Sequence, residues 1–519
     1  MKNIKEYIVL VICLLGILTS CYDDKGNYDY HDIRKIRIDT TGLDPTLWRN
    51  VLQGDSIIIR PEIEIPEGVE ADLRYYWLAY PQYYGPVQDG NAMVYPPADT
   101  LSVQKQLAVK MMLKPATYNI VYIVENLKTG LREFMSFYST IQKTLETGLF
   151  VLQEFDGNTD VDIIRTDRTM MGTPTRARKY YSSVYDELIP GKPLFLNFCR
   201  SYTYPNDYFY LFTDREGLRL SGQDFTLMEK FDEMFYTVPN YNPQGYTFLN
   251  NSEFLINDGK LYLLYINQAN DRKFSAAIAG DYNLAPFFPN ETITTWYPVE
   301  GQMNYQMVVY DQKKQRYLPL QPYASEFAQF KEKDLEAPFD VNHIGHKLVY
   351  AESGYEKYFY SIFEDETGKR YLYLPKFANI VDNGNLAQEK GIYDLSACTD
   401  IQNAKFWGVC GAGPIMVYAT EKGLYSYNYQ GTGISQLLFP FPSNLKVTCL
   451  YLWCPGGHPA NSRVVWVGTW DEVAGKGYLY EFEIGPASGV LEANPFGKQV
   501  KNPEVFEDFG KIKHMIFKL

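Results

Sequence analysis

The sequence predicts an all-β protein, with an N-terminal β-sandwich followed by a seven-bladed β-propeller. Short runs rich in Val, Ile, Tyr and Phe alternate with turns of Gly, Asn, Asp and Pro along most of the chain. Aromatic residues, which favour strands, make up 16% of the composition. Strand–turn–strand pieces recur throughout the chain after residue 145. Helical periodicity is scarce, and one short helix is predicted at residues 325–335.

The N-terminus predicts a signal peptide and a lipid anchor. The apolar run at residues 7–18 follows two lysines and is shorter than the roughly 20 residues that a membrane span needs. It ends in Leu-Thr-Ser-Cys, which resembles a bacterial lipobox, so Cys21 is the predicted lipidation site. Each buried CH₂ of an acyl chain contributes about 0.8 kcal/mol, and two or three chains hold a protein on a bilayer. We expect a signal peptide at 1–20 and a lipidated linker at 21–32.

Two acidic residues follow the predicted lipidation site. Asp23 and Asp24 resemble the export signal that sends Bacteroidota lipoproteins to the outer face of the outer membrane. The resemblance implies a protein that is lipid-anchored in the outer membrane and faces the cell exterior.

Composition narrows the classes of partner. The 519-residue chain is 46% hydrophobic, enough for sizeable cores, and is too long for one ordinary domain. Its net charge of −13, without long Lys/Arg clusters, argues against binding to nucleic acid or to anionic headgroups. The cysteines after the predicted lipidation site are odd in number and scattered, so they predict no disulfide framework, and most of them are expected to be small core residues: Cys199, Cys398, Cys410, Cys449 and Cys454.

Residues 33–142 predict the sandwich. Trp77 lies in the middle of LRYYWLAY, where a sandwich often buries its central tryptophan, and residues 118–141 read as a hairpin. Tyr118 lies where a tyrosine corner forms, so the order of elements resembles an immunoglobulin-like domain. The cysteine pair of antibody domains is missing. The predicted inner-facing positions of DSIIIRPEIEI are Ile57, Ile59, Ile63 and Ile65.

The stretch CYDDKGNYDY, followed by YYWLAY and ATYNIVYIVENLKTG, is similar to the PKD-like lipoproteins of Bacteroidota. The resemblance covers residues 21–142. It implies a sandwich ahead of a large β-rich region. It also implies association with a TonB-dependent outer-membrane importer of the starch-utilisation type and with the lid lipoprotein of that importer. The resemblance brings no catalytic residues.

Residues 145–519 predict the propeller. Seven hairpins turn at Gly157, Gly217, Gly259, Lys314, Gly368, Gly423 and Gly477. The last four steps between these turns are each about 54 residues long, which is typical of four-stranded blades. The apolar segment at 511–519 is expected to pair with the strand at 148–155 and to close the ring. A pair of large β-sandwiches is the alternative architecture.

Motifs for chemistry are weak. His343 and His346 lack the glutamate and third ligand of a zinc site, and GAGP at 411–414 lacks the lysine of a phosphate loop. The Gly-x-Ser-x-Gly elbow does not occur. The 62 acidic residues offer many carboxylate pairs, but no pattern selects one. We therefore predict no catalytic residue, cofactor or metal.

Aromatic residues near predicted loops are the candidate contacts for a ligand or partner, because their rings offer rigid amphipathic surface. The alternative for each is a place in a blade core or seam. The candidates are Trp407, Trp453, Trp470, Tyr202, Tyr204, Tyr83 and Tyr84.

Two functions remain. We predict a non-catalytic surface lipoprotein that serves nutrient uptake by binding a glycan, a peptide or the importer itself. The alternative is a lipid-anchored propeller hydrolase that attacks a glycan or a peptide.

Overall fold

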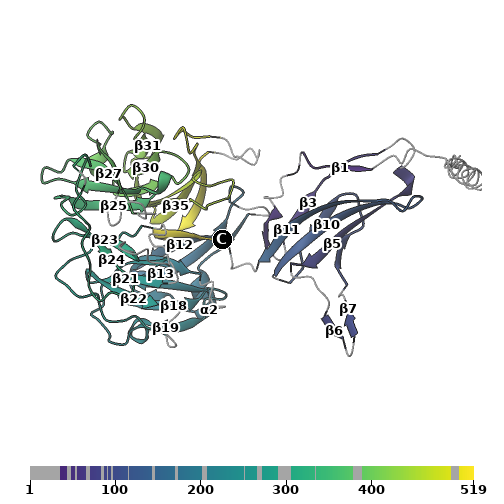
Figure 1. Cartoon of the computed structure of the whole chain (residues 1–519), viewed down its shortest axis with the longest axis horizontal. Helices are drawn as coiled ribbons and strands as arrows, with labels where there is room; N and C mark the ends of the chain where they lie inside the picture. The colour runs from purple at the N-terminus through teal and green to yellow at the C-terminus, as the bar shows by residue number, and fades with distance from the viewer. Residues whose placement is uncertain are drawn as a thin grey trace, which may run out of the picture.

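The structure is a computed structural model. It describes residues 36–519 except 42, 44–47, 53–54, 66–69, 83–86, 90–91, 95–96, 115, 143–146, 170–173, 201–206, 250–251, 266–271, 290–304, 334, 378–387 and 493–501. Figure 1 shows two β-rich parts side by side, with the earlier strands in one and the later strands in the other. The chain is all-β, as predicted.

The N-terminal part is a sandwich. One layer is a five-stranded sheet in the order β2-β11-β10-β5-β8, and the other holds the pairs β1–β4 and β3–β9. A separate hairpin, β6–β7, projects from it (Figure 1). The strands are β1 (Arg37–Asp39), β2 (Asn50–Leu52), β3 (Ser56–Ile59), β4 (Glu62–Glu64), β5 (Leu73–Pro81), β6 (Val87–Asp89), β7 (Ala92–Val94), β8 (Asp99–Ser102), β9 (Leu107–Lys110), β10 (Ala116–Asn126) and β11 (Arg132–Gln142).

The core of the sandwich follows the predicted pattern. Trp77 is fully buried in β5 and stacks on Tyr122 of β10, with 4.2 Å between ring centroids. The Tyr118 hydroxyl donates to the main-chain oxygen of Lys114 at 3.1 Å, which is the predicted tyrosine corner. Ile57 and Ile59 are buried, whereas Ile63 and Ile65 are only partly buried.

Seven antiparallel sheets follow in the described part of the chain, a number consistent with seven blades. The first three are β14-β13-β12-β37, β16-β17-β18-β19 and β20-β21-β22. Their strands are β12 (Gly148–Phe155), β13 (Asn158–Arg165), β14 (Thr175–Ala177), β16 (Pro193–Cys199), β17 (Tyr208–Thr213), β18 (Gly217–Ser221), β19 (Leu227–Lys230), β20 (Pro243–Leu249), β21 (Ser252–Asn257), β22 (Lys260–Tyr265) and β37 (Lys511–Lys518). The short β15 (Ile189–Pro190) also pairs with β13.

The other four sheets are β23-β24, β25-β26-β27-β28, β29-β30-β31-β32 and β33-β34-β35-β36. Each of the seven predicted hairpins is an antiparallel pair in one of the seven sheets. The strands are β23 (Met307–Asp311), β24 (Arg316–Leu320), β25 (Lys347–Ser353), β26 (Phe359–Glu364), β27 (Arg370–Lys376), β28 (Gln388–Asp394), β29 (Phe406–Val409), β30 (Ile415–Thr420), β31 (Gly423–Asn428), β32 (Gln436–Pro440), β33 (Leu445–Leu452), β34 (Val464–Asp471), β35 (Lys476–Glu483) and β36 (Glu504–Phe509).

The last strand joins the first sheet, as predicted. β37 pairs antiparallel with β12, with Leu149 opposite Phe517, and it also lies beside β16 and β33 of the neighbouring sheets. The yellow C-terminal strands meet the blue β12 in Figure 1. This pairing covers the edge of β12 that would otherwise be exposed.

Aromatic residues fill the seams between sheets. Tyr310 and Tyr317 of the β23–β24 hairpin pack on Phe363 of β26 in the next sheet, with centroids 5.1 and 6.3 Å away. A seam between twisted sheets needs large, rigid side chains, and this need accounts for much of the aromatic composition.

The helix predicted at 325–335 is wrong. The main chain there bonds to other segments, because the Ser325 oxygen accepts from Ala279 N at 2.7 Å and Ala328 N donates to Pro319 O at 2.9 Å. Phe330 is buried between sheets. A short helix, α2 (Tyr180–Tyr185), forms elsewhere in the chain. There Asp160 accepts a hydrogen bond from the main-chain N–H of Tyr181. Among the residues that the structure describes, no helix has the length and apolar character of a membrane span.

Candidate functional site

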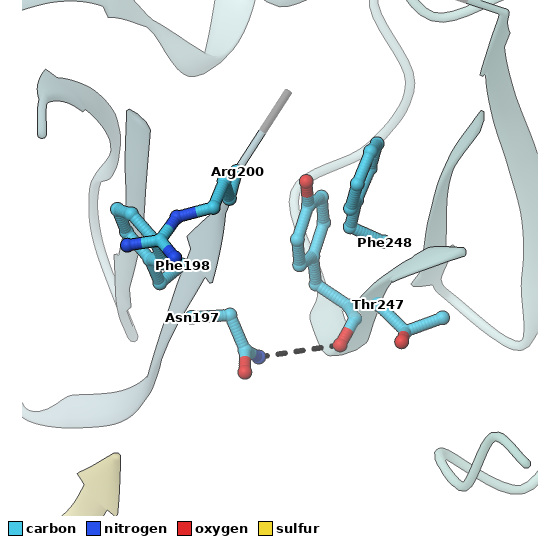
Figure 2. Close-up of a pocket in the computed structure, with 6 residues that line it drawn as sticks. Asn197, Phe198, Arg200, Thr247 and Phe248 are labelled. Carbon is cyan, nitrogen blue, oxygen red and sulfur yellow. Dashed lines mark hydrogen bonds between the residues drawn. The ribbon is translucent and has the colours of Figure 1, made fainter. Parts of the chain in front are cut away.

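A pocket of about 240 Å³ opens between β16 and β20, which belong to neighbouring sheets. In Figure 2, Arg200 and Phe198 lie on one wall and Phe248 on the other. The lining is aromatic and polar together, a combination that is common where small ligands bind. The lining residues are Asn197, Phe198, Arg200, Tyr246, Thr247 and Phe248.

The alternation of β16 fixes the walls. Asn197 points towards β20, and its Nδ2 donates to the main-chain oxygen of Tyr246 at 3.3 Å (Figure 2). Phe198 points to the opposite side and packs on Phe209, with centroids 5.0 Å apart. Both residues are only partly buried, so they are held in place and still reachable.

Arg200 follows directly after β16 and supplies the charge of the pocket. Its side chain is 44% exposed, its Nη2 donates to the Leu519 oxygen, and its Nε lies 4.0 Å from Asp207 Oδ2. A guanidinium carries five N–H donors in one plane, so these contacts leave donors free for a ligand. Carboxylate, carbonyl and hydroxyl oxygens all suit such a donor.

The buried carboxylate of Glu253 holds the floor of the pocket in place. The Tyr246 hydroxyl donates to Glu253 Oε2 at 3.0 Å, the Tyr210 hydroxyl donates to the same oxygen, and Arg272 Nη2 lies 3.4 Å from Oε1. Burial raises the pKa of both tyrosines well above the ordinary value, so the phenols stay protonated as donors. This network makes the floor rigid.

A second titratable cluster links β25, β29 and β33. Glu352 Oε2 accepts from the Tyr350 hydroxyl at 2.7 Å and from Val409 N at 2.9 Å. Cys454 Sγ donates to Val409 O at 3.3 Å, and the Ser462 hydroxyl donates to this sulfur at 3.4 Å. Burial raises the pKa of Glu352 to about 7. Cys454, unlike the other described cysteines, is exposed.

A third cluster joins the first and last sheets. Arg168 Nη1 lies 3.1 Å from Glu481 and 3.6 Å from Glu504, and its Nε lies 3.5 Å from Glu483. Trp466 Nε1 donates to Glu481 at 2.7 Å. Burial raises the pKa of Glu483 to about 7. Because Arg168, Glu481 and Glu483 are almost fully buried, the cluster holds the seam and is closed to ligands.

The tryptophan predictions are corrected by burial. Trp453 is 2% exposed and packs on Phe517 of the closing strand, with centroids 4.2 Å apart. Trp407 is 3% exposed and packs on Tyr418 at 5.5 Å. The prediction that these two rings form a contact surface is wrong, because both rings are buried in the seams between sheets. Trp470 is partly buried in β34.

Five predicted site residues lie outside the described residues. They are the lipidation site Cys21 and the tyrosines Tyr83, Tyr84, Tyr202 and Tyr204. These predictions stand as predictions.

The histidines and cysteines have local roles. His343 Nδ1 is 2.9 Å from Asp340 Oδ2 on an exposed turn, and His346 stacks on Tyr371 at 5.9 Å. Four of the cysteines are buried thiols: Cys199, Cys398, Cys410 and Cys449. Within the described ranges, no three His, Cys, Asp or Glu side chains gather as a metal-binding group.

Sequence reasoning missed Arg200. It lies in CRSYTYPNDYFY, the stretch from which Tyr202 and Tyr204 were chosen. The available signal was an arginine directly after the β-rich run LFLNFC, with Phe198 and Tyr202 each two positions away. What makes it a site residue is β20, which contributes the opposite wall and lies more than forty positions later in the chain.

The model of the PKD-like family matches residues 21–193, so the predicted resemblance to that family is confirmed for the sandwich and continues into the first sheet of the propeller. A search of curated proteins finds no match.

Several solved structures are similar in fold. A quinonprotein alcohol dehydrogenase-like protein from Bacteroides thetaiotaomicron is 11% identical, with a TM-score of 0.42, over 93% of this chain and 99% of that chain. The WD40 domain of SCAP from fission yeast is 11% identical, with a TM-score of 0.33, over 61% and 74%. The extracellular domain of a putative one component system from B. thetaiotaomicron is 11% identical, with a TM-score of 0.31, over 66% and 45%. The strand pairing described above, rather than these similarities, defines the fold.

Proposed function

We propose that this protein is a non-catalytic binding lipoprotein of the outer cell surface. In this proposal Cys21 carries the lipid, and the protein assists a TonB-dependent importer of the starch-utilisation type and its lid lipoprotein. The observation that carries the binding role is the Arg200 pocket, where an exposed guanidinium, an amide and aromatic rings meet on a rigid floor. The match to the PKD-like family supports a surface accessory role.

The lining chemistry favours binding over turnover. In this proposal Asn197 and Arg200 orient an oxygen-bearing group, and Phe248 packs against its apolar face. Glycoside hydrolysis needs two carboxyl groups on opposite sides of one bond, whereas the six lining residues are polar, aromatic or basic. A lipid anchor would keep the pocket beside the importer, so weak binding there acts at a high effective concentration.

Lipidation is tested at Cys21. Labelling of cells with a clickable fatty acid is expected to mark the wild type and to leave Cys21→Ser unmarked, because the thiol is the predicted acyl acceptor. Equal labelling of both proteins would rule out this anchor.

Binding is tested at Arg200. In a pull-down from outer membranes, we expect the protein to recover importer components, and the purified protein to release no product from candidate glycans or peptides. Arg200→Ala is expected to weaken ligand binding about tenfold or more, since a charge-assisted hydrogen bond is lost. The matched control is Arg178→Ala, which removes an exposed arginine paired with Asp508. Reproducible cleavage that one carboxylate substitution abolishes would favour the hydrolase instead.

A further inference from the structure

A second cavity, of about 440 Å³, lies between the sandwich and the propeller and shares Arg200 with the first pocket. The chain end marked C in Figure 1 lies on the side of the propeller that faces the sandwich. Both domains contribute to the lining, which consists of Asn50, Thr140, Arg200, Asp207, Gly222, Gln223, Lys518 and Leu519. Its volume is within the range of small-ligand sites, which often form at domain interfaces.

The sandwich wall is set by strand pairing. Asn50 of β2 lies opposite Thr140 of β11 in a parallel register. The Thr140 main-chain N–H donates to Arg49 O at 2.7 Å, and its hydroxyl lies 2.9 Å from that of Thr117. Both side chains therefore reach the cavity from a fixed backbone.

The propeller wall is set by the end of the closing strand. Lys518 is buried, its Nζ donates to Gly222 O at 2.6 Å, and it lies 4.7 Å from the Phe198 ring centroid. Gly222 N donates to Asp207 O at 2.7 Å. These bonds hold the turn that presents the exposed side chain of Gln223 to the cavity.

The two walls are joined by a buried ion pair. Arg165 Nη2, at the end of β13, lies 2.5 Å from Asp55 Oδ2, just before β3. The two side chains are 4% and 11% exposed. A pair this well shielded fixes one domain against the other more firmly than a surface pair does.

The lining chemistry points to hydroxyl groups. The amides of Asn50 and Gln223 both donate and accept hydrogen bonds, Asp207 accepts and Arg200 donates. Neighbouring hydroxyls of a sugar ring likewise donate and accept at short spacing. The charge of Arg200 is already shared with Asp207 and the Leu519 oxygen, which disfavours a strongly anionic ligand.

The adjoining pocket supplies the other half of sugar recognition. Phe248 is partly buried there, on the wall opposite Arg200 in Figure 2, and its ring can pack on the C–H face of a sugar. A peptide would instead call for an open strand edge or apolar side-chain pockets, whereas Leu519 supplies the one apolar side chain among the described residues that line the larger cavity.

We propose that the two cavities form one site for a neutral oligosaccharide, with Arg200 at its centre and the sandwich as part of the binding surface. This inference rests on the proposed binding function and names its ligand class. It also gives the sandwich a direct role in recognition.

The test uses the full-length protein in detergent and titration calorimetry with neutral hexasaccharides of α-glucan, β-glucan, xylan and mannan. At least one is expected to bind. For that sugar, Asn50→Ala and Gln223→Ala are each expected to weaken binding about fivefold to tenfold, as the loss of one hydrogen bond does. The matched controls, Asn119→Ala on the same sandwich and Gln436→Ala on an outer strand of the propeller, are expected to leave affinity unchanged.

Each outcome has a distinct meaning. Binding of no hexasaccharide at millimolar concentration, or binding that is indifferent to both cavity variants, would overturn the oligosaccharide site. Recovery of the importer in a pull-down would in that case leave the proposed accessory function intact. Cleavage of a bound hexasaccharide would overturn the non-catalytic function while the variants still located the site.

Discussion

At the scale of single residues, the polar groups inside the propeller differ in how they respond to pH. Glu352 lies in a hydrogen-bond network with Tyr350 and the main chain of Val409, and it has no cationic partner in that network. Burial therefore disfavours its charged form and raises its pKa to about 7. Burial also raises the pKa of Glu483, although the positive charge of Arg168 acts to lower it.

The raised pKa of Glu352 predicts a pH-dependent stability. Between the ordinary glutamate pKa and about 7, the folded state binds more protons than the unfolded state, so the free energy of unfolding falls as pH rises through this window. Glu352→Gln is expected to flatten this fall and to be more stable than the wild type at pH 8 by about 1–3 kcal/mol. Denaturant unfolding of both proteins at pH 5 and pH 8 measures this difference in the free energy of unfolding. An identical pH slope in the variant would contradict the prediction, and the exposed Glu366→Gln serves as the control.

At the scale of elements, the closing strand does more than complete one sheet. β37 pairs with β12 and lies beside β16 and β33, and His514 Nδ1 accepts from Leu196 N of β16 at 3.4 Å. Burial lowers the pKa of His514 to about 4, so the imidazole remains a neutral acceptor at neutral pH. The strand therefore joins the last sheet, the first sheet and the second.

Removal of the closing strand is expected to destabilise the propeller strongly. Deletion of residues 511–519 exposes the edge of β12 and removes the buried side chains of Ile512 and Met515, each worth about 2–5 kcal/mol on truncation. We expect loss of at least about 4 kcal/mol, or loss of cooperative unfolding, in thermal and denaturant melts. Lys511→Ala is the control. An unchanged melting temperature after the deletion would show that the ring does not depend on this strand.

At the scale of the whole molecule, the Arg165–Asp55 pair links the sandwich to the propeller. It is buried at the junction, and the larger cavity has walls from both parts. A sandwich that only raised the propeller from the membrane would need no such fixed contact. The shape of the larger cavity therefore depends on the orientation of the two domains as well as on their folds.

Loss of this pair is expected to loosen the junction. In Asp55→Ala, Arg165 loses this carboxylate at a buried position, which typically costs about 3–5 kcal/mol. Small-angle scattering is expected to show a wider range of inter-domain distances, while each domain keeps its strand content by circular dichroism. Arg37→Ala, which removes an exposed pair with Glu64, is the control. A scattering curve identical to that of the wild type would mean that other contacts hold the junction.

Local patterns were enough to predict the blade hairpins and the central features of the sandwich. The seven hairpins, the inner-facing Trp77 and the tyrosine corner at Tyr118 all depend on residues close together in the sequence. The pairing of the last strand with the first was also predictable, because an apolar terminal strand needs a partner. The prediction of a helix at 325–335 was wrong because the apolar residues there pack into a seam that only the neighbouring sheets create.

The sequence by itself therefore determined the fold class and the blade hairpins, because each depends on short-range spacing and residue type. The anchor at Cys21 remains a prediction of the same kind. Only the tertiary structure decided which aromatic residues fill seams and which face a cavity. Trp407 and Trp453 became core residues because sheets distant in sequence close over them. Arg200 became a candidate site residue because the closure of the ring and the docking of the domains bring β20, the closing strand and the sandwich to it.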